Sequence, residues 1–223
     1  MLYKKNLTSC LDPKLFQNPT SEYRGTPFWA WNCKVSKEDV DRTLNALKEM
    51  GMGGAHIHSR TGMDLPYLSK EFMDMVHYSH EKSNELGMIT WLYDEDRWPS
   101  GYGGGLVTKA PEFRQRFLVF SPEKLPLCEN VKSEDGGSSA KAISSGNRTF
   151  LARYAIRLEN GYMTEYHRLS PDETVPEEFA TWYLYREISG DNAWFNDQAY
   201  VDTLNPKAIN KFIEITHEAY YRE

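Results

Sequence analysis

Cysteines and long apolar runs are both scarce in this chain of 223 residues. The three cysteines, Cys10, Cys33 and Cys128, are odd in number and far apart, so they indicate neither a zinc-binding spacing nor a disulfide framework. No run of apolar residues is long enough to form a transmembrane helix. We therefore expect a soluble protein that has no membrane partner.

Positive charge is also in short supply. The chain has 26 Lys and Arg against 32 Asp and Glu, a net charge of −6. Phosphate binding requires a basic face, so nucleic acid is not expected to be the partner. Export stays open: Leu7 to Cys10 is similar to a lipoprotein cleavage site, but the residues before it lack an apolar segment. A periplasmic or extracellular location would need a signal missing from this chain.

Apolar residues, by contrast, make up 40% of the chain, enough for a sizeable core. Aromatic residues make up 13%, which suits stacking against sugar rings and suits core packing equally well. The first strand is expected over 27–32, an aromatic run that ends in Asn32. Ser36 then begins a helix through a capping box with Asp39, and Gly51 suits its left-handed C-cap.

The same pattern of strand and helix is repeated once. A second strand is expected over 54–58, a second helix begins near Ser69 and closes at Gly87, and a third strand covers 88–93. The two helices end alike, in Glu-Met-Gly-Met and Glu-Leu-Gly-Met. Strands that alternate with helices through short connections are expected to be parallel, so that their carboxyl ends lie along one edge.

The pattern changes after Gly105. Residues 113–120, 149–158 and 181–188 alternate as antiparallel strands do, and they indicate an inserted β-rich subdomain. A fourth βα unit is then predicted, with a strand at 201–204 and a helix that begins at Asn205 and Pro206. The expected division is a lead-in at 1–26, three βα units at 27–105, the insertion at 106–198, and a truncated fourth unit at 199–223.

The stretch from Trp91 to Gly101 carries the strongest functional signal. Strand-forming residues lead into Asp94, Glu95 and Asp96, followed by Arg97 and Trp98. Three adjacent carboxylates cannot all lie unpaired in a core, so we expect them where the strand leaves its sheet, which is the edge where α/β folds bind ligands. This edge is interpreted as a polar pocket for a sugar. The alternative is a solvated acidic loop.

Four motifs together resemble glycoside hydrolase family 106, the α-L-rhamnosidases and their bacterial relatives. The resemblance covers 27–109 and 200–220, and the motifs that carry it are Pro27 to Asn32, Gly53 to Met63, Pro66 to Ser69 and Trp91 to Gly101. It implies the first four βα units of a (β/α)8 TIM barrel, interrupted by the antiparallel insertion. It also implies hydrolysis by two carboxylic acids, and we expect these on later strands, beyond Glu223. An unclosed barrel would expose sheet edges and favour self-association.

Eight residues are predicted to bind substrate around the carboxyl ends of the strands. His56 and His58 share one face of their strand, Arg60 could bind an acid of the Asp94 stretch, and Trp98 could stack on a sugar. The alternatives are a core histidine, a surface ion pair and a tryptophan that plugs the barrel mouth. No cofactor is certain, although Asp94 and Asp96 could hold calcium. The set is Asn32, His56, His58, Arg60, Asp94, Glu95, Asp96 and Trp98.

The predicted function is that of the N-terminal part of an α-L-rhamnosidase-like glycoside hydrolase. It would act on plant or microbial polysaccharide side chains, and this chain would supply sugar-binding residues rather than the complete catalytic pair. One alternative is a non-catalytic carbohydrate-binding or scaffold protein derived from the same barrel. Another is an α/β enzyme for a non-carbohydrate substrate, with a metal at the acidic edge.

Overall fold

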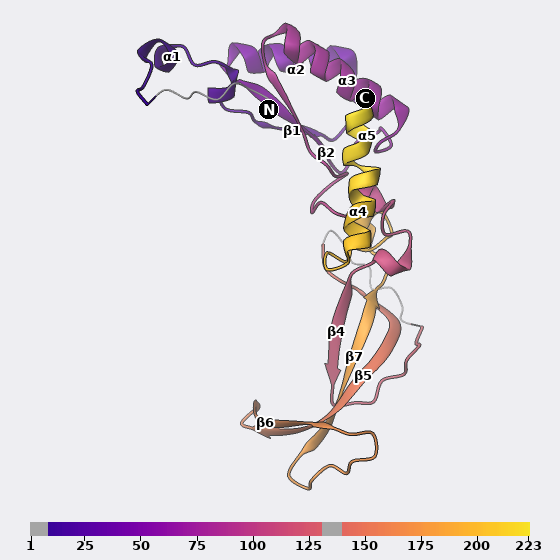
Figure 1. Ribbon diagram of the computed structural model, residues 1–223. Coiled ribbons are helices and arrows are strands. Elements are labelled where there is room, and N and C mark those ends of the chain that lie inside the picture. The colour runs from indigo at the N-terminus through magenta and orange to yellow at the C-terminus, as the bar shows by residue number, and fades with distance from the viewer. Residues whose placement is uncertain (1–8, 131–139) are drawn as a thin grey trace. The chain divides into compact units, whose positions relative to one another are not determined.

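The computed structural model describes residues 9–130 and 140–223, and its chain divides into two units (Figure 1). The first unit contains residues 1–100 and 214–223, and the second contains residues 101–213. Residues 1–8 of the expected lead-in and 131–139 of the expected insertion lie outside the described part. The domain boundaries proposed from the sequence stay predictions.

The first unit is built on a parallel sheet with the strand order β1-β2-β3. Trp31 of β1 pairs with Ser59 of β2, and Ile57 of β2 pairs with Leu92 of β3. Two helices connect the strands and lie side by side in Figure 1. The elements are β1 Phe28–Trp31, α2 Lys37–Glu49, β2 Gly54–Ser59, α3 Lys70–Glu85 and β3 Ile89–Leu92. The expected strand and helix order is thus confirmed for this segment.

The helix ends follow from local side-chain chemistry. Ser36 and Asp39 form the predicted capping box, and the Ser69 hydroxyl accepts a hydrogen bond from the backbone N–H of Phe72. Gly51 and Gly87 have φ values of 81° and 65°, the left-handed conformation expected after each helix. These caps satisfy backbone groups that a helix end would otherwise leave without partners.

The core of the first unit lies between the sheet and these helices. Trp31, Ala55 and Ile57 project to this side, and Val40, Leu44 and Phe72 are buried against them. Trp29 also packs there, edge-on to Trp31 with ring centroids 5.6 Å apart. Trp31 is thus part of the buried core, and Trp29 is partly buried against it.

The opposite face of the sheet carries a set of stacked rings. Alternation along β2 places His56 and His58 on this face. His56 stacks on Trp91 with centroids 5.5 Å apart, and His58 stacks on Tyr93 at 3.8 Å. The face therefore combines aromatic surface with two imidazoles.

The second unit contains a four-stranded antiparallel sheet with the order β4-β7-β5-β6 (Figure 1). The hairpin that joins β5 to β6 was not predicted, although Asn160 and Gly161, with φ values of 52° and 83°, form the left-handed turn that Asn-Gly favours. The strands are β4 Arg116–Ser121, β5 Ser144–Glu159, β6 Tyr162–Leu169 and β7 Ala180–Ser189.

The partial TIM barrel predicted from the sequence is wrong. The parallel sheet has three strands, and the residues expected to form a fourth, 201–204, form a turn instead. Val201 makes an isolated antiparallel bridge to Arg114, and the Asp202 carboxylate accepts from the backbone N–H of Leu204 and from Arg116. The side-chain bonds of Asp202 therefore favour a turn over pairing with the parallel sheet. The longer strands of the chain belong to the antiparallel sheet. The chain is β-rich, with a small parallel sheet.

The remaining elements are short. Asn205 caps α4 as predicted, because its side-chain oxygen accepts from the backbone N–H of Lys207. In the part of the chain that the structure describes, no helix is long and apolar enough to cross a membrane. The other elements are α1 Pro13–Gln17, α4 Pro206–Ile215, α5 His217–Arg222 and the 3-10 helices Ser21–Tyr23, Gly103–Gly105, Pro111–Phe113 and Ala193–Phe195.

Candidate functional site

Polar and aromatic side chains gather where the three parallel strands of the first unit end. The backbone N–H of Arg60 bonds to the Trp31 carbonyl at 2.9 Å, and that of Tyr93 bonds to the Ile57 carbonyl at 3.1 Å. The strands therefore stay aligned just past their last residues, and the loops after them start at one edge. We call the group the strand-end cluster: His58, Tyr67, Tyr93, Asp94, Glu95, Asp96, Trp98, His217 and Tyr220.

His58 is the buried imidazole of this cluster, with 3% of its surface exposed. Its Nδ1 lies 2.6 Å from the Ser59 carbonyl oxygen, and its ring lies between Tyr93 and Phe28. Burial lowers the pKa of His58, and the positive charge of Arg60 lowers it further, while the Ser59 carbonyl and Asp96 act in the opposite direction. The neutral form is therefore favoured.

Asp94 connects the loop after β3 to α5. Its Oδ1 accepts from the Ser100 hydroxyl at 2.6 Å, and its Oδ2 lies 2.9 Å from His217 Nε2. The first contact closes the loop from Asp94 to Ser100 on itself. The second joins the loop to a histidine that is 51% exposed, so this pair presents both an acceptor and a titratable ring to solvent.

Glu95 and Asp96 are both buried, with 0% and 8% of their surfaces exposed. Glu95 Oε1 accepts from the backbone N–H of Asp96 at 2.8 Å, and Asp96 Oδ2 lies 3.7 Å from Arg97 Nε. Asp96 therefore lies beside Arg97. Because β3 ends at Leu92, strand alternation does not determine the sides on which Asp94 and Asp96 lie.

Two tyrosines lie beside these acids. Burial raises the pKa of Tyr67 and of Tyr220, and each is raised further by the nearby charges of Asp94 and Glu95. The Tyr220 hydroxyl donates to the Tyr93 carbonyl at 3.3 Å. Both phenols are therefore kept neutral close to these acids.

The remaining predicted site residues are Trp98, which follows the acids on the same loop, and Arg60, His56 and Asn32, which are not part of the strand-end cluster. Trp98 is 57% exposed, so it does not plug a buried opening. Arg60 makes no ion pair with the Asp94–Asp96 acids within residues 9–130 and 140–223. His56 lies two residues back from the strand end, with its Nδ1 3.1 Å from the Thr26 carbonyl. Asn32 is exposed after β1, and its carbonyl lies under Gly62, where an added Cβ would approach to 2.8 Å.

Metal binding has little support from the positions of these side chains. Among the described residues, no group of three or more His, Cys, Asp or Glu side chains is arranged to hold a metal ion. Asp94 directs its two oxygens to Ser100 and His217, and Asp96 has Arg97 as a neighbour. Calcium at Asp94 and Asp96 stays a prediction.

Sequence reasoning did not place His217, Tyr220, Tyr93 and Tyr67 in the site. In the sequence, Tyr67 is noted only within the motif from Pro66 to Ser69, and Tyr220 only at the end of the stretch 200–220 that the resemblance covers. His217 is 123 residues from Asp94 in sequence, so no local spacing could connect them. Tyr93 could have been identified from the register of the parallel strands. Ile57 of β2 pairs with Leu92 of β3, so the next residues, His58 and Tyr93, lie opposite each other.

Comparison with known proteins relates this chain to glycoside hydrolases. No family model matches it. A curated protein of Formosa agariphila named "Putative beta-glucuronidase" is 25% identical over 112 residues, which is 48% of this chain and 9% of that protein. The solved structure of a rhamnosidase from Novosphingobium sp. PP1Y aligns with a TM-score of 0.42 and 20% identity, over 64% of this chain and 15% of that one. The chain is glycoside hydrolase-like in sequence, whereas membership of family 106 is not shown.

The lowered pKa of His58 predicts a pH-dependent stability. Between the ordinary histidine value of 6.5 and the lower folded value, the unfolded chain binds a proton that the folded chain does not. The free energy of unfolding should therefore fall as the pH drops below about 6.5. His58→Gln should remove this part of the slope, as measured by urea unfolding over a pH series.

Tyr93→Leu serves as the control for lost packing. It breaks the 3.8 Å ring stack but keeps the imidazole, so stability should fall while the pH slope remains. An unchanged slope in His58→Gln would show that His58 does not titrate in this way.

Proposed function

We propose that this chain is part of a glycoside hydrolase and that its strand-end cluster contributes sugar-binding groups. The sequence similarity to the Formosa agariphila protein supports the hydrolase class. The chemistry of the cluster supports the sugar, because it combines carboxylates, imidazoles and phenols with an exposed indole. Such sites use aromatic surface for contact area and a few polar groups for orientation.

The observation that carries the proposal is the exposed Trp98 within a closed loop. The bond from Ser100 to Asp94 joins the two ends of the loop, and Trp98 lies between them with 57% of its surface exposed. Because the loop is already closed, less backbone has to be ordered when a ring stacks on this exposed indole. The C–H face of a sugar provides such a ring.

The half-exposed Asp94 and His217 provide hydrogen bonds close to the same loop. The Asp94 side chain is 34% exposed, so its oxygens can accept from sugar hydroxyls in addition to Ser100 and His217. Each carboxylate oxygen has more than one lone pair, which permits this sharing. His217 would then orient the acid as well as contact the ligand.

Catalysis is not assigned to these acids. Inverting glycosidases separate their two carboxyl groups by roughly 6.5–9.5 Å to admit a water. Asp94, Glu95 and Asp96 are consecutive, and Glu95 is fully buried with one oxygen on the Asp96 backbone. Because Glu95 is buried and bonded within its own loop, a second candidate function is favoured, which is carbohydrate binding without turnover.

The identity of the sugar is the more specific part of the proposal. The resemblance to family 106 supports an α-L-rhamnoside, and the similarity to the Formosa agariphila protein, which is named as a β-glucuronidase, supports a β-glucuronide. Titrating the chain with methyl α-L-rhamnoside, methyl β-D-glucuronide and methyl β-D-glucoside, with backbone amide shifts as the readout, separates these candidates. Shifts at Trp98 and Asp94 are expected for the sugar that binds. If none of the three sugars moves these amides, the proposal is wrong.

Trp98→Ala should weaken sugar binding about tenfold, because removing one well-placed aromatic anchor commonly costs more than 1 kcal/mol. Stability should hardly change, since the side chain is mostly exposed. Binding is measured by the same titration and stability by urea unfolding. Tyr23→Ala removes another half-exposed aromatic of the first unit and is the matched control. Equal affinity in wild type and Trp98→Ala would exclude Trp98 from the site.

A further inference from the structure

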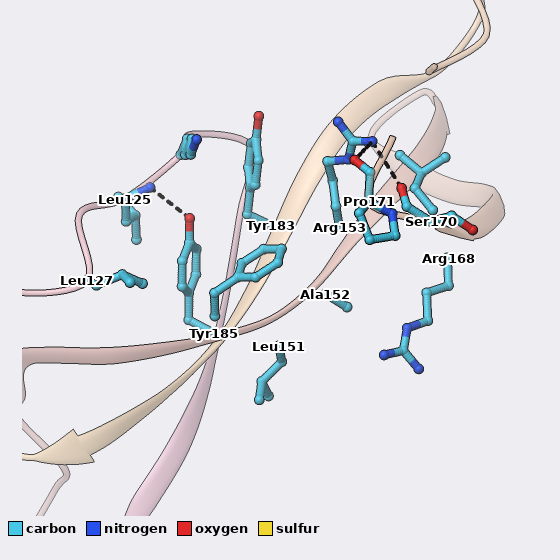
Figure 2. A pocket seen from close by; sticks show the side chains of 13 residues that line it. Leu125, Leu127, Leu151, Ala152, Arg153, Arg168, Ser170, Pro171, Tyr183 and Tyr185 are labelled. Atoms are coloured by element: carbon cyan, nitrogen blue, oxygen red, sulfur yellow. Dashed lines mark hydrogen bonds between the residues drawn. The ribbon is translucent and has the colours of Figure 1, made fainter. Parts of the chain in front are cut away.

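The second unit contains a pocket of about 550 Å³ on one face of its antiparallel sheet. Its floor comes from β5 and β7, and a wall comes from the segment that follows β4 (Figure 2). The Tyr185 hydroxyl accepts from the backbone N–H of Leu125 at 3.0 Å, which holds this wall against the sheet. Every lining residue belongs to the second unit, so the pocket is separate from the strand-end cluster.

Aromatic rings form much of the floor. Tyr183 and Tyr185 are two residues apart on β7 and project to the same side of the sheet in Figure 2. Phe150 of β5 packs edge-on to Tyr185, with ring centroids 5.8 Å apart. Phe150 remains 48% exposed, so an apolar face is open to a ligand. A sugar ring presents a matching C–H face.

Among the described residues, the charged side chains that line the pocket are all positive. These are Lys124, Arg153 and Arg168, and no described aspartate or glutamate lines it. This is unusual in a chain with a net charge of −6. Lys124 makes no ion pair or hydrogen bond within the described residues. Arg168 lies at the margin, and Figure 2 shows its side chain directed away from the tyrosines. The local charge therefore favours an anion near Lys124 and Arg153.

Arg153 is held in position for such an anion. Its Nη2 donates to the backbone carbonyls of Ser170, Pro171 and Glu173, at 3.2, 3.1 and 2.5 Å. Its Nε and Nη1 have no bond to the described residues, so these donors remain for a ligand. Arg153 pairs directly with Tyr183 across the strands, which brings cation and ring together on one face. A fixed guanidinium binds a carboxylate at low entropic cost.

We propose that this pocket binds an anionic sugar unit, stacked on the tyrosines and bound through its acidic group to Arg153 and Lys124. The anionic part follows from the charges of the pocket. The sugar part rests on the proposed function, because a flat acid of another kind would meet the same rings and cations. The second unit would then hold a charged unit of a glycan at a site separate from the strand-end cluster.

The test titrates the full chain with D-glucuronic acid and with D-glucose, which differ by the acidic group, and follows backbone amide shifts. Glucuronic acid should move the amides of Tyr183 and Lys124, with an affinity about tenfold or more above that of glucose. Lys124→Gln and Tyr183→Ala should each weaken glucuronic acid binding severalfold. Arg157→Gln, a cation on the same strand but outside the pocket lining, should have no effect.

Several outcomes would overturn the proposal. Equal affinities for the two sugars would remove the role of the cations. Inorganic sulfate that binds as tightly as glucuronic acid would identify a simple anion pocket. Glucuronic acid binding that is lost in Trp98→Ala and kept in Lys124→Gln would place the sugar at the strand-end cluster, which would overturn this inference while supporting the proposed function. Arg153→Lys keeps the charge and tests the guanidinium without a large loss of folding.

Discussion

Replacing Glu187 with glutamine is expected to lower the free energy of unfolding of the antiparallel unit by about 3 kcal/mol, because removing one partner of a buried ion pair is strongly destabilising, even though Arg148 keeps its ion pair with the half-exposed Glu129. Glu187 is 1% exposed and lies 2.8 Å from Arg148 Nε, whose side chain is 8% exposed. It also accepts from the Ser144 hydroxyl and from the backbone N–H of Gly146. Urea unfolding at neutral pH measures the loss.

The loss of stability in Glu187→Gln also depends on pH, because the Glu187 carboxylate can be protonated. Burial by itself would raise the pKa of Glu187, but the bonds from Ser144, Gly146 and Arg148 lower it overall. The stabilisation is therefore present above the pKa of an unfolded glutamate, about 4.3, and is lost as the pH falls through the lower folded value. The difference between wild type and Glu187→Gln should shrink below about pH 4.

Glu178→Gln is the matched control, an acid-to-amide change in an ion pair of the same unit. Its carboxylate contacts Arg157 but is 70% exposed, so its loss should change stability by less than about 1 kcal/mol. Similar effects of the two substitutions would show that burial does not strengthen the Glu187 pair.

Phe72→Ala should destabilise the first unit by about 3–5 kcal/mol, the usual range for removing a buried phenylalanine ring. Phe72 is 1% exposed, and its ring centroid lies 5.8 Å from that of Trp31 and 5.4 Å from that of Tyr67. It also lies 6.4 Å from Tyr220, so it joins the core to the strand-end cluster. Any sugar binding at that cluster should weaken as well.

Phe16→Ala makes the same change at a position that is 71% exposed, and it should alter stability by less than about 0.5 kcal/mol. Both variants are compared by urea unfolding, with backbone amide shifts of Tyr67 and Tyr220 as a local probe. A loss below about 1 kcal/mol in Phe72→Ala would mean that the core collapses around the missing ring without cost.

Local chemistry made much of the first unit predictable. Ser36 and Asp39 indicate the start of a helix, because their side chains bond to free backbone N–H groups. Gly51 indicates its end, because glycine readily adopts a left-handed conformation. Val40 and Leu44, four residues apart, lie on one face of this helix, and that face is buried in the core. Each of these signals acts within a few residues, so a sequence carries them without knowledge of the fold.

Predictions that depended on pairing between distant segments failed more often. The strand expected at 201–204 is a turn, because Val201 pairs with Arg114 and the Asp202 side chain binds nearby groups. The partial barrel that the family resemblance implied, with this strand in its fourth unit, is wrong as well. The missed hairpin at Asn160 and Gly161 is different, since its turn signal was local and was overlooked.

The candidate site divides in the same way. Sequence pattern alone placed Arg60 and Asp94 just after two parallel strands, because alternating strands and helices bring strand ends to one edge. It could not show that Asp94 contacts His217, or that the described residues lining the second unit's pocket include cations but no acids. Helix caps, turns and strand faces are determined by neighbouring residues and the backbone. Which strands pair, which charges become buried and which distant side chains meet depend on long-range packing, and only the tertiary structure decides them.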